Sequence, residues 1–222
     1  MSKKDKHKIK VTKNGPYITT GGIPLAEQKI RIDKDNQCHG WKEGLKYPAQ
    51  ETYALCRCGG SSHKPFCDGT HLKKQFDGSE TASHASYLEQ AEETRGSDLR
   101  LTDAQNLCAA ARFCHRAGGT WKLTEQSTDP AAKNTAIEEA GDCPSGRLVA
   151  WDNYGKALEP KFAPSIGLVH DTQAGKMGPL WVRGGIQIES ADGQPYEVRN
   201  RVTLCRCGKS RNKPFCDGSH LR

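Results

Sequence analysis

Two stretches of the chain repeat the same arrangement of metal-binding side chains. The first, CRCGGSSHKPFCDGTH, occupies residues 56–71, and the second, CRCGKSRNKPFCDGSH, occupies residues 205–220. Both follow the pattern Cys-x-Cys-x8-Cys-x3-His, although several residues between these positions differ. Three thiolates and one imidazole form a complete four-ligand set for a metal centre. The candidate ligands are Cys56, Cys58, Cys67 and His71 in the first stretch, and Cys205, Cys207, Cys216 and His220 in the second.

The spacing within each stretch favours iron–sulfur chemistry over zinc. Structural zinc sites usually take cysteines that are two to four residues apart, whereas a Cys-x-Cys pair is tighter and can place two thiolates on one iron. A histidine four residues after a cysteine lies on the same face of a helical turn, so this second pair can hold a second iron. Two ligands on each of two irons is the requirement of a [2Fe-2S] cluster. A structural zinc-binding interaction module is the alternative that uses the same side chains.

Both stretches resemble the CDGSH iron–sulfur family, also called the NEET proteins. The family signature is Cys-x-Cys-x2-Ser/Thr-x3-Pro-x-Cys-Asp-Gly-Ser/Ala/Thr-His, and both copies match it at every position. The resemblance implies one [2Fe-2S] cluster per copy, held by three cysteines and one histidine. Single-motif members of the family are dimers, so the resemblance also implies that this tandem chain folds as the same pair within one polypeptide.

One histidine per cluster has consequences for the redox chemistry. A neutral imidazole leaves the cluster less negative than a fourth thiolate would, which raises its reduction potential. The outer imidazole nitrogen can also exchange a proton, which couples reduction to pH. We therefore expect one-electron transfer or redox-sensitive cluster donation, with a redox protein or a cluster acceptor as partner and no enzymatic activity.

Four further cysteines lie outside the two ligand sets. Cys108, Cys114 and Cys143 are similar in arrangement to the ligands of a divergent single-cluster ferredoxin, and three cysteines suit a [3Fe-4S] cluster at best unless Cys38 joins them. If residues 105–117 form one helix, however, the first two lie about 240° apart around it and cannot meet. We therefore expect buried core thiols at all four positions. A third cluster on Cys108, Cys114 and Cys143 is the less favoured alternative.

The repeat extends beyond the ligands, so each copy is a small module. NGPYITTGGIPL (residues 14–25) matches MGPLWVRGGIQI (residues 177–188), and the first copy carries a 14-residue insertion after Leu25 that holds Cys38. The second segment predicts two short strands broken at Gly184-Gly185, and the first copy should build the same strands.

Two further elements are predicted around the ligands of the second copy. YEVRNRVTL (residues 196–204) alternates apolar and polar residues, which predicts a half-buried strand that leads directly into Cys205. CDGSHL (residues 216–221) fits the first turn of a short helix, with Asp217 near its cap.

The residues between the two copies differ in character from both. SHASYLEQAEETRG (residues 83–96) predicts a short helix. LTDAQNLCAAARFCHRAGG (residues 101–119) predicts a longer one, because Thr102 and Gln105 fit a capping box and two glycines provide a stop. Residues 122–180 predict short strands and loops, with GRLVAWD (residues 146–152) as the clearest strand.

Composition limits the class of protein further. The 222 residues are 35% hydrophobic and 27% charged, which predicts a small hydrophobic core. Metal centres are expected to add to its stability. No run of about 18 apolar residues predicts a membrane span, and the first residues lack the features of a signal peptide. Cytoplasmic residence, where thiols stay reduced, is therefore expected. The net charge of +7 predicts a solvated basic arm more than a nucleic-acid-binding surface, because much of it comes from Lys3, Lys4, Lys6, Lys8, Lys10 and Lys13.

The expected architecture is α+β, with two small β-rich modules paired within the chain and a mixed α/β segment between them. Residues 1–80 are assigned to the first CDGSH iron–sulfur module and its basic N-terminal arm. Residues 81–176 form the middle ferredoxin-like segment, and residues 177–222 form the second module. We expect a monomer in which the two modules form an internal pseudo-dimer.

Overall fold

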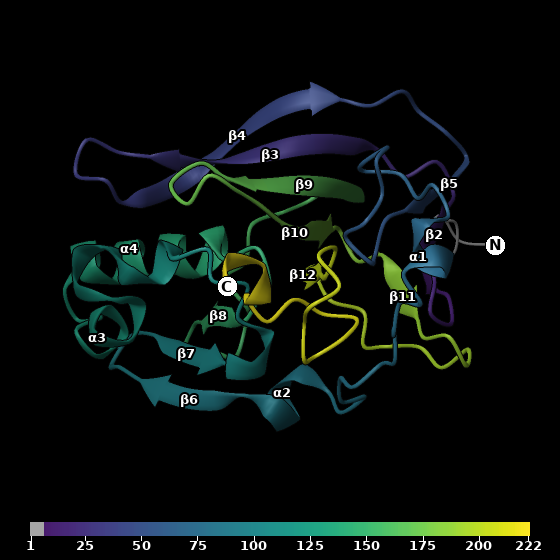
Figure 1. The fold of residues 1–222 in the computed structure, drawn as a ribbon. Helices are drawn as coiled ribbons and strands as arrows, with labels where there is room; N and C mark the ends of the chain where they lie inside the picture. Colours follow the sequence, from purple (N-terminus) through teal and green to yellow (C-terminus); the bar gives the residue numbers. More distant parts are fainter. Residues whose placement is uncertain (1–6) are drawn as a thin grey trace.

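Short strands and a few helices build an α+β fold in the computed structural model, which describes residues 7–222 (Figure 1). The strands are β1 (Lys8–Val11), β2 (Tyr17–Thr20), β3 (Leu25–Ile32), β4 (Cys38–Lys46), β5 (Thr52–Leu55), β6 (Glu92–Arg95), β7 (Arg100–Asp103), β8 (Leu148–Trp151), β9 (Ser165–Asp171), β10 (Lys176–Arg183), β11 (Gln187–Glu189) and β12 (Arg201–Leu204). The α-helices are α1 (Thr70–Lys73), α2 (Tyr87–Gln90), α3 (Thr120–Glu125) and α4 (Pro130–Asp142). Single 3₁₀ segments are η2 (Gln105–Leu107), η3 (Phe113–Gly118) and η4 (Ser219–Leu221).

The two larger sheets each combine strands from both copies of the repeat. In the four-stranded sheet, β1, β2 and β5 of the first copy are joined by β11 of the second, which runs parallel to β1. In the five-stranded sheet, β10 and β12 continue into β9, which precedes the residues assigned to the second copy but forms a hairpin with β10. β3 of the first copy runs parallel to β9 and is followed by β4. The exchange is reciprocal, so each sheet depends on a strand from the other copy. A third sheet, β6-β7-β8, belongs to the middle segment.

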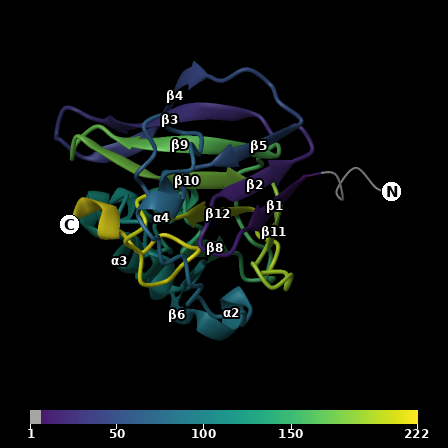
Figure 2. The ribbon, with the colours of Figure 1, turned by 45° about the vertical axis from the view of Figure 1, so that its right-hand side comes forward.

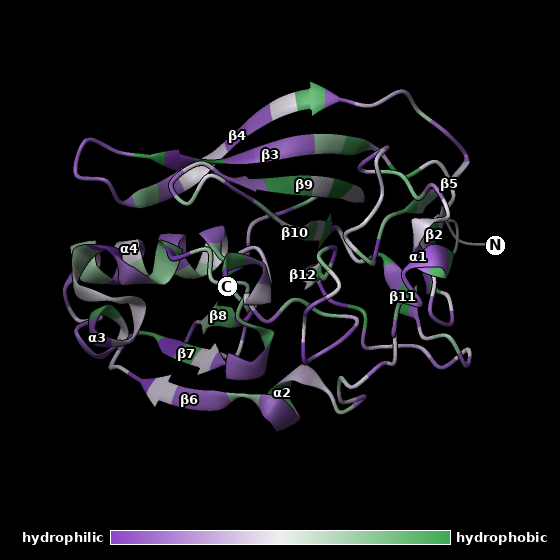
Figure 3. Ribbon diagram, viewed as in Figure 1, coloured by the Kyte–Doolittle hydropathy of each residue, from purple (hydrophilic) through white to green (hydrophobic). Residues whose placement is uncertain are grey.

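One hydrophobic core serves both copies. Its buried residues include Ile9, Tyr17 and Leu55 from the first copy and Leu180 and Leu204 from the second. Figure 3 shows apolar residues on β9, β10 and β12 inside the molecule, whereas the outer strand β6 is mostly polar. None of the helices within residues 7–222 has the length and apolar character needed to cross a membrane.

The basic N-terminal segment is in part a strand, so Lys8 and Lys10 do not belong to an arm, although their side chains stay 41% and 51% exposed. Both lysines lie on β1 and form ion pairs with Glu189 of β11. Ile9 and Val11 alternate with them and are fully buried, which is the pattern of a strand with one face on the core. Lys13 lies in the turn after β1, and Lys3, Lys4 and Lys6 lie outside the described residues.

Strands near the ligands are mostly where the sequence predicts them. Gly184-Gly185 separate β10 from β11, and the matching pair in the first copy separates β2 from β3. The strand that leads to Cys205 is shorter than predicted, since β12 begins only at Arg201, and all four of its residues are buried. Arg201 donates hydrogen bonds to the carbonyl oxygens of Ala140 (2.7 Å) and Leu148 (3.0 Å). The middle segment therefore covers the strand face that the alternating pattern assigned to solvent.

The middle segment departs most from prediction. The single helix expected over residues 101–119 is wrong: Thr102 lies on β7, and a loop with positive φ at Ala110 (55°) and Arg112 (64°) separates η2 from η3. The helix expected over residues 83–96 is limited to α2 and is followed by β6. The strand expected in GRLVAWD is confirmed as β8.

Residues 122–180 also contain a helix where only strands and loops were expected. α4 spans 13 residues, with Pro130 in its first turn. The side chain of Asp129 caps it by accepting a hydrogen bond from the backbone nitrogen of Ala131 at 3.0 Å. Asp followed by Pro is a start signal for a helix that was available in the sequence.

Candidate metal centres

The four candidate ligands of the first copy form two pairs. The sulfur atoms of Cys56 and Cys58 are 3.9 Å apart. The sulfur of Cys67 lies 3.3 Å from Nδ1 of His71, one helical turn further along the chain. The spacing Cys-x-Cys thus builds one pair and Cys-x3-His builds the other, as the sequence predicts.

The second copy repeats this geometry closely. The sulfur atoms of Cys205 and Cys207 are 3.7 Å apart, and that of Cys216 lies 3.5 Å from Nδ1 of His220. Over residues 7–222, no three or more Cys, His, Asp or Glu side chains gather in a group suited to one metal ion. The donors of each copy are therefore arranged two by two, which fits a centre containing two metal atoms better than a single tetrahedral ion.

Backbone hydrogen bonds hold the two pairs of the first copy against each other. The loop between them folds back on the strand end, so that the nitrogen of Cys56 donates to the carbonyl oxygen of Pro65 at 2.8 Å. The nitrogen of Cys67 donates to the carbonyl oxygen of Ala54 at 2.9 Å. In the second copy, Cys205 and Cys216 make the equivalent bonds to Pro214 (2.8 Å) and Thr203 (2.9 Å). The site is therefore positioned locally, by the end of a strand and the loop that follows.

The signature aspartate fixes this loop in each copy. Asp68 accepts hydrogen bonds from the backbone nitrogen of Ser62 (2.8 Å) and from that of Thr70 (3.0 Å). These bonds, with those from the hydroxyls of Thr70 and Ser62, hold the pKa of Asp68 well below its usual range. Asp217 accepts the equivalent bonds from the backbone nitrogens of Arg211 (2.9 Å) and Ser219 (3.0 Å). It lies next to Gly218, the N-cap of the ligand turn, as predicted.

The protonation of the thiols reflects their crowding. Hydrogen bonding from Cys207 lowers the pKa of Cys205 to about 6. Hydrogen bonding with Cys205 raises the pKa of Cys207, and burial raises that of Cys216. Without a metal, two negative charges on sulfurs this close together are unfavourable. One cysteine therefore ionises while its neighbours stay protonated. Metal binding must then displace protons from these sulfurs.

A buried arginine lies between the first two cysteines of each copy. Arg57 is 1% exposed, and its guanidinium donates to the carbonyl oxygens of Thr12 (3.2 Å) and Gly78 (2.5 Å). Arg206 is 8% exposed and donates to Gly178 (2.6 Å) and to Val169 (2.8 Å). Because these carbonyl partners carry no full charge, each guanidinium keeps a net positive charge in the interior of the protein.

The two ligand loops meet back to back through a matched pair of glycines. A Cβ on Gly59 would lie 2.7 Å from the carbonyl oxygen of Cys207, and a Cβ on Gly208 would lie 2.8 Å from that of Cys58. Both glycines also have positive φ, at 73° and 78°. Only glycine allows this reciprocal approach of the two backbones.

Tyr17 is a residue of the site that the sequence did not reveal. This fully buried side chain of the first copy donates its hydroxyl to the carbonyl oxygens of Cys205 (2.8 Å) and Pro214 (3.1 Å) in the second copy. In the repeat alignment its counterpart is Leu180, which has no polar group. Because most positions of this aligned segment differ between the copies, the sequence offered no clear signal for Tyr17.

The surroundings of the two ligand sites differ. Leu72, which follows the first ligand histidine, is 74% exposed, and nothing lies within 4 Å of a Cβ built on Gly69. A Cβ on the equivalent Gly218 would lie 3.0 Å from Cβ of Ala110 in the middle segment. Figures 1 and 2 show the yellow C-terminal turn close to the teal middle segment, and in Figure 1 α1 is well separated from it. The middle segment covers the second site and leaves the first open.

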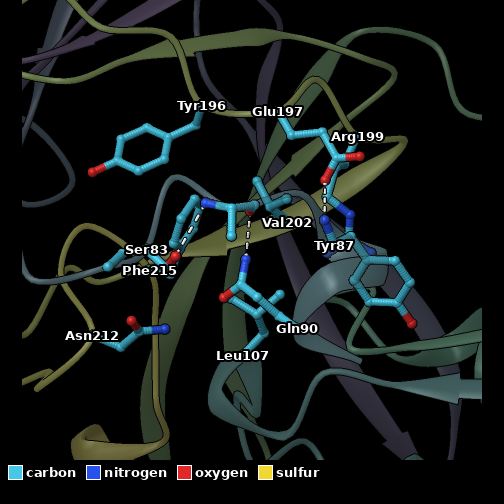
Figure 4. Close-up of a pocket in the computed structure, with 12 residues that line it drawn as sticks. Ser83, Tyr87, Gln90, Leu107, Tyr196, Glu197, Arg199, Val202, Asn212 and Phe215 are labelled. Carbon is cyan, nitrogen blue, oxygen red and sulfur yellow. Dashed lines mark hydrogen bonds between the residues drawn. The ribbon is translucent and has the colours of Figure 1, made fainter. Parts of the chain in front are cut away.

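A small cavity lies beside the second ligand loop at this contact. Phe215 and Tyr196 line it from the second copy, and Tyr87 and Leu107 line it from the middle segment (Figure 4). Its volume of about 30 Å³ suits one or two water molecules and not a substrate.

Three of the four remaining cysteines line the same cavity, although they do not form a group suited to one metal ion. Cys108, Cys114 and Cys143 all line one cavity of about 20 Å³, because the loop that replaces the predicted helix brings the first two to the same side. Burial, and then the neighbouring Cys143 and Cys108, raise the pKa of Cys114 to about 12. Cys38 does not line this cavity and lies 3.6 Å from Oε1 of Gln173. The single helix on which the geometric objection rested is therefore absent. The expectation of buried core thiols is confirmed for Cys38, whereas Cys108, Cys114 and Cys143 are only partly buried.

Comparison with known protein families finds two of them in this chain. The family described as iron-binding zinc finger CDGSH type matches residues 14–72 and again residues 177–221. The family described as divergent 4Fe-4S mono-cluster matches residues 94–153 between them. Comparison with curated proteins and with solved structures gave no match.

Proposed function

We propose that this chain, which has two CDGSH-type iron-binding segments around a divergent 4Fe-4S segment, binds two [2Fe-2S] clusters and transfers single electrons. The family matches support an iron–sulfur protein. Each cluster would be held by the four ligands of one copy, with the Cys-x-Cys pair on one iron and the Cys-x3-His pair on the other. We propose a carrier with no catalytic residue of its own.

The observation that carries this proposal is the pairing of the donors. Two sulfurs at 3.7–3.9 Å and a sulfur–nitrogen pair at 3.3–3.5 Å are suitable separations for two ligands on one tetrahedral metal. Because the pairs do not merge into one group of four, a single zinc ion fits this arrangement less well. When bound, such a cluster accepts and returns one electron without a change in its ligands.

The chain's own residues supply the environment for that chemistry. Arg57 and Arg206, each next in sequence to two ligand cysteines, provide buried positive charge that would offset the negative charge of a reduced centre. The backbone bonds to Pro65 and Pro214 fix the ligands in both redox states. A site that does not rearrange favours rapid electron transfer.

The two modules are proposed to be the intramolecular form of a symmetric pair. The reciprocal exchange of β3 and β11 and the reciprocal contacts of Gly59 and Gly208 both support this proposal. In a symmetric dimer, residue i of one subunit contacts residue j of the other, and j contacts i. A monomer that contains both centres is therefore the expected state in solution.

Iron and sulfide analysis of the anaerobically purified protein tests the proposal. We expect a red-brown protein with visible absorption and two irons and two sulfides for each of the two sites. Zinc in place of iron, with no acid-labile sulfide, would favour the structural zinc-binding module instead. The variants Cys67→Ser and Cys216→Ser then assign the iron to each site.

A third cluster is proposed at Cys108, Cys114 and Cys143. The donor set fits a cluster with three thiolate ligands, and the family match to a divergent 4Fe-4S segment supports it. The cavity of about 20 Å³ is smaller than such a cluster, so Cys108, Cys114 and Cys143 would hold one only if the cavity widened. Cys114→Ala should then remove iron beyond that of the two paired sites. Cys38→Ala is the matched control and should leave the iron content unchanged.

Electron transfer and cluster donation can be separated by one assay. The holoprotein is incubated anaerobically with an apo-ferredoxin, and the ferredoxin is then recovered and its absorption is measured. A carrier keeps its clusters, whereas a donor transfers the one at the open first site. Retention of all iron by the protein supports electron transfer.

A further inference from the structure

A large cavity lies away from the ligands of the two repeated motifs, none of which lines it. It has a volume of about 720 Å³ and opens where β4, the C-terminal half of α4, the segment of residues 158–162 and the end of β10 meet. We call it the hairpin cavity, because the insertion of the first copy, which forms the β3–β4 hairpin, supplies one of its walls. Its volume lies within the range of small-molecule sites, about 300–1,000 Å³.

Three aromatic rings line one side of the hairpin cavity. The rings of Trp41 and Trp181 are 4.5 Å apart between centroids, and Phe162 meets Trp181 edge-on at 5.5 Å. Trp181 is 2% exposed and packs in the core, so this wall is held in place before any ligand arrives. Ile137 and Leu158 add aliphatic surface. The wall suits a flat apolar body.

The acidic side chains of the cavity are already bonded to buried arginines. Asp142 accepts a hydrogen bond from Arg116 at 3.2 Å, and Glu159 pairs with Arg201. Glu138 lies 3.9 Å from the same Arg116 and is 66% exposed at the rim. These carboxylates therefore do not require a cation from a ligand.

Arg183 is the charged group of the cavity that lacks a partner. Its guanidinium lies 4.6 Å from the ring centroid of Trp181 and 5.8 Å from that of Phe162. Within residues 7–222 its side chain has no hydrogen bond and no ion pair, and its Nε is buried. The nearby Glu43 is bonded to Lys46 at 2.9 Å. A guanidinium stacked on aromatic rings keeps its edge free for a planar anion.

We propose that the hairpin cavity binds a small aromatic carboxylate, with its ring against the partly exposed Trp41 and Phe162 and its carboxylate on Arg183. Arginine binds a carboxylate through two parallel charge-assisted hydrogen bonds, which gives both strength and orientation. The rings of the wall match the flat body of such a ligand. This site is separate from the cluster ligands, so the inference stands whether or not the proposed clusters transfer electrons.

Isothermal titration calorimetry of the full-length holoprotein tests the inference. The probe is 2-naphthoate, and its neutral isostere 2-naphthamide and the cation 2-naphthylmethylammonium are the comparison ligands. We expect the carboxylate to bind at least tenfold more tightly than the amide, and the cation to bind weakest. No binding of 2-naphthoate, equal binding of acid and amide, or a preference for the cation would overturn the proposal.

Variants then assign the selectivity to one side chain. Arg183→Gln should remove the difference between acid and amide, and Arg183→Lys should restore part of it because the charge returns. Arg100→Gln is the matched control, since Arg100 also stacks on a tryptophan, Trp151, at 4.9 Å but is bonded to Glu93 at 3.0 Å in another sheet. Selectivity that survives in Arg183→Gln, or that is lost equally in Arg100→Gln, contradicts the assignment.

Discussion

In the first copy, the turn that carries the ligand histidine faces outward, with Leu72 74% exposed beside it. In the second copy the same turn is packed under the middle segment, and Gly218 is buried against Ala110. Yet the distances within the ligand pairs are nearly equal in the two copies, at 3.3–3.9 Å. The geometry of each site is therefore set by its own strand and loop, whereas access to it is set by the segment between the copies.

The largest expected effect comes from removal of one ligand in either copy. Cys67→Ser and Cys216→Ser should each lose the two irons and two sulfides of one site and keep those of the other, because each ligand set is positioned by its own backbone bonds. Iron and sulfide analysis of both variants measures this. If either variant loses both sites, the two copies do not bind metal independently and the comparison fails.

A large difference in iron release should distinguish the open site from the covered one. With an excess of an iron chelator, we expect two phases, and the open site should lose its iron at least tenfold faster because no opening of the middle segment is needed first. Absorbance of the iron–chelator complex follows both phases.

Two histidine variants assign the phases to the sites. His71→Cys should slow only the fast phase and His220→Cys only the slow phase, because a thiolate replaces a ligand that acid removes. A single rate would show that the middle segment does not limit access.

What the sequence predicts well is what depends on few residues close in the chain. Cys-x-Cys and Cys-x3-His place their own side chains next to each other, and Asp217 lies next to the N-cap of the turn that follows it. The break at Gly184-Gly185 is equally local. These features need only the conformations of neighbouring residues, which the residue types restrict.

The second ligand turn is covered by residues 108–110 of the middle segment, which we call the cover. The cover depends on contacts between residues far apart in the sequence, which no local pattern encodes. The helical pattern around Cys108 and Cys114 failed because tertiary contacts hold Ala110 and Arg112 at positive φ, against their intrinsic preference. The capping signal at Asp129-Pro130 was present, but the surrounding loop-forming residues obscured it. The contact between Gly218 and Ala110 joins residues more than a hundred positions apart.

Alanine substitutions at two equivalent glycines measure how tightly the middle segment packs on the second ligand turn. Gly69 and Gly218 have nearly the same positive φ, 83° and 81°, so alanine should cost about 1–2 kcal/mol at either position from backbone strain alone. At Gly218 the new methyl group also meets Cβ of Ala110 at 3.0 Å, which adds about 1–3 kcal/mol of overpacking. Urea unfolding of Gly69→Ala and Gly218→Ala provides the two free energies. An equal loss of unfolding free energy in the two variants would mean that the middle segment does not pack tightly against the second ligand turn.

The cover should loosen as the pH rises through neutrality. Burial raises the pKa of Glu139 on α4 from 4.5 to about 7, against the opposing effects of Thr120 and Arg116. The folded state therefore favours the protonated form, and this contribution is fully present below pH 4.5 and is lost as the pH rises through 7. The loss is about 1–3 kcal/mol, allowing for the nearby Arg116.

Glu139→Gln provides the control for this pH dependence, because the amide keeps an acceptor for Thr120 but cannot ionise. In the wild-type protein the slow phase of iron release should accelerate between pH 6 and pH 8 more than the fast phase does. In the variant the two phases should keep a constant ratio. An unchanged pH dependence in Glu139→Gln would assign the effect to another group.

The smallest expected effect concerns the hydroxyl of Tyr17, which bonds to the second ligand loop and has no counterpart at Leu180. Tyr17→Phe removes the hydrogen bonds to Cys205 and Pro214, while Tyr53→Phe removes a similar buried bond of 2.8 Å to the carbonyl oxygen of Ile23, which belongs to no ligand loop. Each variant should lose about 1 kcal/mol of unfolding free energy. Only Tyr17→Phe should lower the reduction potential of the second site, because it withdraws the positive end of an O–H dipole from the peptide of a ligand cysteine. Potentiometric titration followed by EPR separates the signals, with His71→Cys used to identify the first site. If both tyrosine variants leave the two potentials unchanged, the hydroxyl of Tyr17 stabilises the fold but does not tune the second site.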